Sequence, residues 1–381
     1  MLKYTLLLLL VLSTYIYAEE NSEGNISNEL NFFTKEGDLD LSEYMSQAYG
    51  FLPVPIIITE PAVGYGGGMA LIYLHDTLVG KQSSTGHRIP PSISGALIAA
   101  TENGTKASGA FHIGYWLEDT LRTATYIGKP DIFIDMYGDN FAFNMHFDGL
   151  FFYQSIKKRI MESHIFLGAA YMYVKTDVTF DFNKLEKDFS GESNVASLSL
   201  LAEYDSRDNQ LSPNKGQFIS LKAQFYDENL GGDYNFINYK STNLFYNELN
   251  SKINLDFNIV ADWVEGDKSE IPSYLYPFIS MRGIPMMRYQ GEKVITLQSQ
   301  FSYDITSRWK GLVFGGIGRT FGKQIAAPEH SFSEAANRVA GGIGFRYLLA
   351  EKFGLRVGID LAKSEESETF YIQVGTAWKG F

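Results

Sequence analysis

Ile253-Asn-Leu-Asp-Phe-Asn-Ile-Val-Ala-Asp-Trp263 alternates apolar and polar side chains along almost its whole length. Successive side chains of a β-strand point to opposite faces, so the stretch predicts a strand with one apolar and one polar face. Asp256 and Asp262 fall on the polar face in mid-strand, where only water tolerates them. A strand with an apolar medium on one side and water on the other is typical of a transmembrane β-barrel.

The same alternation recurs from residue 51 to the C-terminus and predicts sixteen strands. Most run about 10–14 residues, which matches a tilted membrane span of about 9–11 residues with margins. In Phe141–Tyr153 the odd positions are mostly apolar, so we expect them to form the outer face. Strict alternation also occurs in soluble β-sandwiches. The strand length, the mid-strand charges and an apolar face on nearly every strand favour an all-β, antiparallel transmembrane barrel.

Composition narrows the possible functions. Aromatic residues make up 15% of the chain and glycines number 36, as expected of interfacial girdles and barrel bends. No run of about 18 apolar residues follows residue 18, so no helical membrane span is predicted. Cysteine is absent and the net charge is −12, which excludes disulfides and argues against nucleic-acid binding. We expect no cofactor and no metal site.

The N-terminal region divides into two parts. Residues 1–18 have the pattern of a secretory signal peptide with cleavage after Ala18. Residues 19–50 form a short periplasmic segment in which Asp40–Ala48 has helical spacing. This segment is either a disordered tail, which we expect, or a short helix that plugs the barrel or caps its mouth. The barrel then occupies residues 51–381, and an even strand count places both termini in the periplasm of an outer-membrane protein.

One long connection interrupts the alternating pattern. Tyr276–Gly291 contains Pro277 and Pro285, which exclude a regular helix or central strand. It is nevertheless rich in Met, Phe, Ile and Tyr, unlike an ordinary solvated loop. By strand parity the loop lies on the extracellular side. We predict that it folds back into the lumen and that Arg282 docks on a carboxylate of the wall.

Four passages carry a resemblance to a known family: Pro55–Gly68, Tyr204–Gly216, Met281-Arg282-Gly283 and Gly342–Phe381. In this order they resemble the bacterial surface-antigen barrel family, the membrane domain of BamA- and TamA-like outer-membrane assembly factors. The match covers about residues 51–381. It implies a sixteen-stranded barrel with an inward-folded extracellular loop.

The resemblance implies that Arg282 and Gly283 lock this loop to the wall. The family places an acidic partner on the thirteenth strand, but Val313–Arg319 contains no acid here. The aromatic residue that follows Arg-Gly in the family is Ile284 in this chain. Residues 19–50 are also too few for a POTRA domain, so we expect none. The remaining candidate partners of the loop arginine are Asp360, Asp304 and Glu203.

The resemblance singles out two further regions. The first is a periplasmic turn, for which we expect a structural rather than a substrate-binding role. The second is a seam between the first and last strands, which is either a lateral gate or a glycine-rich corner that allows curvature. The turn residues are Asp205, Arg207, Asp208, Pro213 and Gly216. The seam residues are Gly66, Gly67, Gly68, Gly375 and Gly380.

As a function, the resemblance implies insertion or translocation of proteins at the outer membrane. The expected partners are outer-membrane lipid, unfolded outer-membrane or secreted proteins as clients, and the general barrel-assembly machinery for the protein's own insertion. A passive pore or structural barrel without a client is the alternative. An outer-membrane hydrolase is less favoured, because no His, Ser or carboxylate spacing points to a catalytic site. We therefore expect that the protein is not an enzyme.

Overall fold

The computed structural model describes residues 32–47, 50–76, 81–82, 88–137, 142–181, 189–324 and 327–378. The predicted signal peptide, residues 1–18, lies outside the described residues. So do Gly380 of the predicted seam and the first part of the 19–50 segment. Within the described ranges, no helix is long and apolar enough to cross a membrane.

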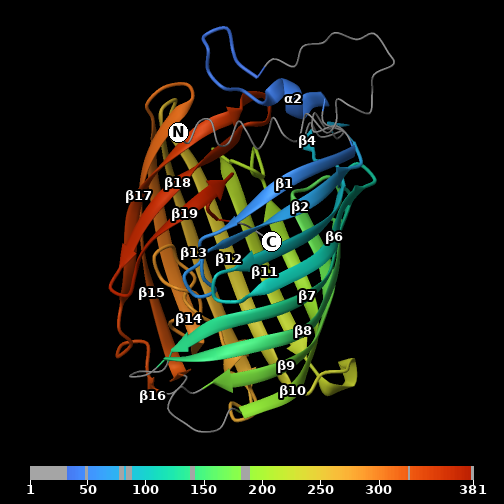
Figure 1. The fold of residues 1–381 in the computed structure, drawn as a ribbon, viewed down its shortest axis with the longest axis vertical. Coiled ribbons are helices and arrows are strands. Elements are labelled where there is room, and N and C mark those ends of the chain that lie inside the picture. The colour runs from blue at the N-terminus through green and yellow to red at the C-terminus, as the bar shows by residue number, and fades with distance from the viewer. Residues whose placement is uncertain are drawn as a thin grey trace.

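The fold is the predicted all-β barrel. Sixteen antiparallel strands form the wall, each hydrogen-bonded to the next along the chain from β1 to β19 (Figure 1). They are β1 (Gly50–Ile58), β2 (Gly66–Leu74), β5 (Ile93–Thr101), β6 (Lys106–Trp116), β7 (Leu121–Tyr137), β8 (Ala142–Arg159), β9 (Ile165–Asp181), β10 (Phe189–Asp205), β11 (Gly216–Tyr226), β12 (Phe236–Asn250), β13 (Ile253–Gly266), β14 (Gly291–Asp304), β15 (Trp309–Gln324), β17 (Arg338–Ala350), β18 (Leu355–Ser364) and β19 (Glu368–Val374).

A few short elements complete the chain. Strand β16 (Ala327–His330) pairs only with β15, and β3 (Lys81–Gln82) pairs with β4 (Arg88–Ile89). The helix α2 (Ser42–Gln47) lies over one mouth of the barrel in Figure 1. Three single-turn 3₁₀ helices lie in connections: η1 (Glu228–Leu230), η2 (Ser273–Leu275) and η3 (Glu351–Phe353).

The two ends of the barrel differ in what they carry. We call the end where β1 begins and β19 finishes the near rim. The opposite end, which carries the β1–β2 turn, is the far rim. Because the strands alternate in direction, the turns β10–β11, β14–β15 and β17–β18 belong to the near rim. The long β13–β14 connection, residues 267–290, belongs to the far rim.

The two faces of the wall follow the alternation of the sequence. On β13 the polar Asn254, Asp256 and Asn258 point inward and are buried, as predicted. The outward side chains are apolar on most strands and stay exposed in the isolated chain. Examples spread around the wall are Ile57, Ile98, Leu150, Leu200, Leu221, Leu297, Val313, Ile343, Leu361 and Val374. An apolar belt this extensive is far larger than a water-soluble protein exposes.

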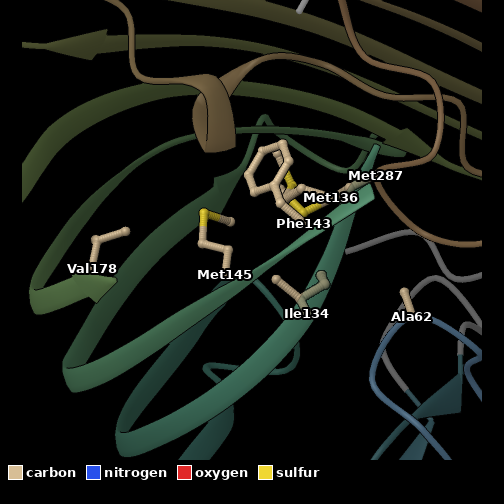
Figure 2. Close-up of a cluster of buried hydrophobic side chains, with 7 residues drawn as sticks. All are labelled: Ala62, Ile134, Met136, Phe143, Met145, Val178 and Met287. Atoms are coloured by element: carbon tan, nitrogen blue, oxygen red, sulfur yellow. The ribbon is translucent and has the colours of Figure 1, made fainter. Parts of the chain in front are cut away.

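Strands β7 to β10 depart from the prediction. They run 17 or 18 residues, longer than expected, and their far ends invert the usual pattern. Phe143 and Met145, expected outside, instead face the lumen, where Met287 of the β13–β14 connection covers them (Figure 2). Phe147 packs against the same inner cluster and Leu150, of the opposite parity, is exposed outside, so the face predicted for the odd positions of this strand was wrong. The outer surface there carries the ion pair Lys175–Glu192, at 2.7 Å. The inner face is therefore apolar in this section, because the loop lies against it, and the outer face carries charged side chains.

In the described part of the chain, the first and last strands of the wall are not joined by a ladder of backbone hydrogen bonds. Among the described residues, β1 pairs with β2 and β19 pairs with β18, and no strand pairing joins β1 to β19. We call this gap the seam. The alternation of Phe370, Ile372, Val374 and Trp378 predicts that the last strand continues to residue 380, with these side chains on its apolar outer face. The strand instead ends at Val374, because Gly375 turns the chain inward with φ of +79°. Trp378, expected on the outer face, is buried in the lumen instead.

Candidate functional site

The β13–β14 connection fills the lumen as predicted. Its centre is an apolar cluster in which Ile279, Met281 and Ile284 pack against Val294 and Ala340 of the wall. Ile279 is fully buried. A backbone hydrogen bond from Ile279 to Tyr289, 3.0 Å long, closes the loop on itself. Burying these side chains holds the loop inside the barrel, since each is worth about 1.5–3 kcal/mol when fully removed from water.

Arg282 is the polar anchor of the loop. Its Nη1 lies 2.6 Å from Oδ2 of Asp360 on β18. Arg346 of β17 contacts both oxygens of the same carboxylate, at 2.6 and 2.9 Å. All three side chains are almost completely buried. The loop arginine is therefore docked on an acid of the wall, and that acid is Asp360.

The flat face of the Arg282 guanidinium is also occupied. Its Cζ lies 3.6 Å from the ring centroid of Phe314 on β15, a cation–π arrangement. Its Nη2 donates to Oε1 of Gln300 on β14, at 3.0 Å. Strand β15, the thirteenth of the wall, thus supplies an aromatic ring where an acid was expected. The acid comes from β18, the fifteenth strand of the wall. Arginine suits this site because a planar guanidinium both pairs and stacks.

Gly283 ties the loop to one edge of the seam. Its N–H donates to the hydroxyl of Tyr371 on β19, at 3.1 Å. Its carbonyl accepts from Ser364 at 2.6 Å and from Ser367 at 2.8 Å, both at the β18–β19 turn. A φ of +94° and wall atoms 3.3 Å from a would-be Cβ explain why glycine stands here.

The other two candidate partners of Arg282 lie beside other cations. Asp304 lies 3.8 Å from Lys310 and 3.6 Å from Arg356 near the near rim. Glu203 pairs with Lys157 at 2.8 Å on a different part of the wall. Both carboxylates are engaged with cations of other strands, as expected of an inward polar face with many charges.

The loop also reaches the other edge of the seam. The N–H of Met286 donates to Oε1 of Glu60 in the β1–β2 turn, at 3.0 Å. Met287 packs against Ala62 of the same turn. Since Gly283 contacts β19, one short loop holds both edge strands at the far rim. The rings of Tyr65 and Phe370 stack across the same end of the seam, with centroids 5.8 Å apart.

Glu60 gives this contact a pH dependence. Burial raises the pKa of the Glu60 carboxyl, and the N–H groups of Met286 and Ala62 only partly oppose the shift. Because the folded-state pKa is raised, the stabilising contribution of protonated Glu60 is fully present at low pH. This contribution is lost as the pH rises through the raised pKa. We therefore expect thermal stability to fall as the pH rises above the ordinary carboxyl range, and Glu60→Gln to flatten that slope. The temperature at which the folded band disappears in heat-modifiable gel mobility, taken at each pH, measures this thermal stability.

The control is Glu365→Gln, which neutralises an exposed carboxyl at the same rim. It should leave the slope of the unaltered protein in place. An equal slope in the Glu60→Gln protein would contradict the assignment of the pH effect to this carboxyl.

The near-rim turn has the structural role that was expected. Asp205 holds Arg207 in a two-point ion pair, at 2.8 and 3.0 Å. Oδ1 of Asp208 accepts from the N–H groups of Asn214 and Lys215. Gly216 adopts a φ of +103° where the turn ends, after Pro213. The charges of the motif are thus used within the turn itself.

This turn also reaches across the lumen to the opposite wall. Nδ2 of Asn209 donates to the carbonyl of Phe353 at 2.8 Å. The carbonyl of Leu211 accepts from the N–H of Thr376 at 2.7 Å. Trp378 then packs against inward side chains of β11 and β12. The turn therefore draws residues 375–378 away from the wall and into the lumen, which leaves β19 short at the near rim.

The seam glycines have a different role from the one considered. A Cβ at Gly66 or Gly68 would lie 2.1 Å from a carbonyl oxygen of β5. These glycines permit close contact between β2 and β5, one strand away from the seam, whereas Gly67 would approach β1 at 3.0 Å. Among the seam glycines that the structure describes, Gly375 is the one that shapes the seam directly.

Several lock residues were not predicted from the sequence. Arg346 lies in the C-terminal passage that carried the resemblance, so its residue type and position could have indicated a role in the lock. Gln300, Phe314 and Tyr371 carry no such signal, because they meet Arg282 and Gly283 only through the closure of the barrel.

No family model matches the chain, and no curated protein matches it in sequence. Solved structures do match. A crystal structure of BamA from Haemophilus ducreyi lacking POTRA domains 1–3 resembles this protein with a TM-score of 0.57. The likeness covers 85% of this chain and 69% of that chain, at 11% sequence identity. It is a likeness of fold.

Proposed function

We propose that the protein spans the bacterial outer membrane, with the near rim in the periplasm. The outward apolar belt supports a membrane environment, and antiparallel barrels cross membranes by pairing their backbone groups from strand to strand. The export signal predicted at residues 1–18 supports the outer membrane. Polar ion pairs on the outside of β7 to β10 then lie above the membrane, on the extracellular side.

Within that membrane, the protein acts on other polypeptides by inserting or translocating them through the seam. The observation that carries this function is the missing ladder between β1 and β19. An unpaired strand edge exposes N–H and C=O groups that a client strand can pair with. The structural resemblance to BamA supports the same class of function, and unfolded outer-membrane or secreted proteins are the client class.

A passive pore fits the geometry less well. The β13–β14 loop occupies the middle of the lumen, and the β10–β11 turn crosses it at the near rim. Water-filled porin-type barrels keep an open polar channel. A barrel with two internal obstructions is suited to sideways exchange at the seam.

Site-specific photo-cross-linking tests the proposed function. A photoreactive phenylalanine analogue replaces Phe51, an exposed residue of β1 beside the seam, in cells that export outer-membrane proteins. We expect adducts with unfolded outer-membrane or secreted proteins at this position. Val313 on β15 is the matched control, because it is equally lipid-facing but lies on the closed wall. The same adducts at both positions, or none at Phe51, would refute client handling at the seam.

A further inference from the structure

Residues 32–47 form an ordered unit on the near rim, which we call the strap. A backbone bridge pairs Phe33 with Leu39, and α2 follows at once. Oδ1 of Asp40 accepts from the N–H of Ser42 at 2.7 Å, which starts the helix. For these residues the expectation of a disordered tail was wrong, and the alternative of a short helix at the barrel mouth is correct.

The strap is attached to the β17–β18 turn by a small apolar core. Leu41, buried to 6% exposure, packs against Ala350 and Phe353. Further apolar side chains line this core. They are Phe32, Leu39, Met45, Leu349 and Leu355. The core removes a leucine from water at a place where the wall alone would leave Phe353 uncovered.

Polar contacts fix the position of the strap. The N–H of Leu41 donates to the carbonyl of Leu349 at 2.8 Å. The hydroxyl of Tyr347 donates to the carbonyl of Leu39, and the N–H of Lys352 donates to Oγ of Ser42. These bonds involve backbone groups of both partners, so the strap is docked in one defined register.

An ion pair adds a second attachment point. Nη2 of Arg308, in the β14–β15 turn, lies 2.8 Å from Oδ2 of Asp40 and 2.9 Å from Glu351. Its Nη1 donates to the carbonyl of Leu348. The Arg308 side chain is only 6% exposed, so the pair is largely shielded from solvent. The strap thus spans two adjacent near-rim turns.

The chain connects this docking place directly to the other edge of the seam. The β17–β18 turn lies on the β19 side, whereas Gly50 begins β1. Gln47 and Gly50 are three residues apart, a reach of at most about 11 Å. At this rim β19 ends at Val374, and Gly375 turns the chain away from the wall. The strap therefore bridges the near-rim end of the seam, as the β13–β14 loop bridges the far-rim end.

We propose that the strap is a releasable fastener that holds β1 against the opposite edge and so controls the opening of the seam. The inference rests on the proposed function, because the seam is its site of action. Among the described residues no strand pairing holds the two edges together, so their separation depends on the contacts at each rim. Releasing Leu41 and Asp40 from the rim frees the start of β1 to move outward.

Distance measurements between spin labels test the strap in the full-length protein in lipid vesicles. The chain has no cysteine, so Phe51→Cys and Val374→Cys introduce the two labels at exposed positions on β1 and β19. Leu41→Asp places a charge in the apolar core and should release the strap. Gln47→Asp is the matched control, since it adds the same charge at an exposed position of α2. Heat-modifiable gel mobility confirms that each barrel is folded.

We expect the label distances to shift to longer values and to broaden in the Leu41→Asp protein, and to stay unchanged in the Gln47→Asp protein. An unchanged distribution in the folded Leu41→Asp barrel overturns the strap proposal, as does an equal shift in the control. The outcome is separable from the client experiment. A shift in label distance without client adducts at Phe51 supports the strap and rejects the assembly function. Client adducts at Phe51 without a shift in label distance support the assembly function and reject the strap.

Discussion

Replacing Asp360 with alanine is expected to destabilise the barrel by about 3–5 kcal/mol, because removing one partner of a buried ion pair leaves uncompensated charge. Here the carboxylate serves two guanidiniums, Arg282 of the loop and Arg346 of β17, and both are almost completely buried. The loss should appear as a lower midpoint in urea unfolding from lipid vesicles, and as a lower temperature at which the folded gel band disappears.

The control for this substitution is Asp262→Ala. Asp262 also points inward and is paired, but with the half-exposed Lys240. Its removal should shift the midpoint much less, because water screens the cation that is left behind. Equal shifts for the two variants would contradict the special position of Asp360 between two buried arginines.

The second large effect is expected from Arg282→Ala, in ion conduction. The substitution removes the pairing to Asp360 and the contact with Phe314, while Arg346 still neutralises the carboxylate. The loop then keeps its apolar contacts but loses its anchor at the centre of the lumen. In planar bilayers we expect the unaltered protein to conduct weakly and the variant to show several-fold larger, fluctuating conductance.

Two further variants make this experiment specific. Arg282→Lys keeps the charge but not the planar group, so it should fall between the two. Arg288→Ala removes another arginine of the same loop, outside the lock, and should behave like the unaltered protein. A large, steady conductance that is the same with and without Arg282 would show that the loop does not obstruct the lumen.

The sequence was sufficient for the strand pattern and for the loop. Alternation along segments such as Ile253–Trp263 predicts strands whatever their partners, since it depends only on neighbouring residues. The apolar, proline-broken loop predicted its own burial, and an arginine within it required an acid. Asp360 could be named as a candidate because it lies on an inward face. Choosing it over Asp304 required the barrel to close, which sets how far each strand lies from the loop.

Alternation also misled where the surroundings change along a strand. It shows that two faces of β8 differ, but not which medium each face meets. At Phe143 and Met145 the inward face of β8 meets the loop. Farther along the strand, inward side chains on the same face meet a polar lumen. Trp378 misled for a related reason: its spacing continues β19, while a single glycine at residue 375 redirects the chain. Both errors arise from long-range contacts that no local pattern reports.

The seam is held at its two ends by elements of different kinds, a loop from inside the barrel and a strap from the N-terminal side. Their contacts lie on opposite rims and share no residue, so their free energies of release should add. The probability that the whole seam parts is then the product of two local probabilities, and stays small when either fastener is closed. Such a seam would act as a coincidence detector, because it opens fully only when both rims are released together.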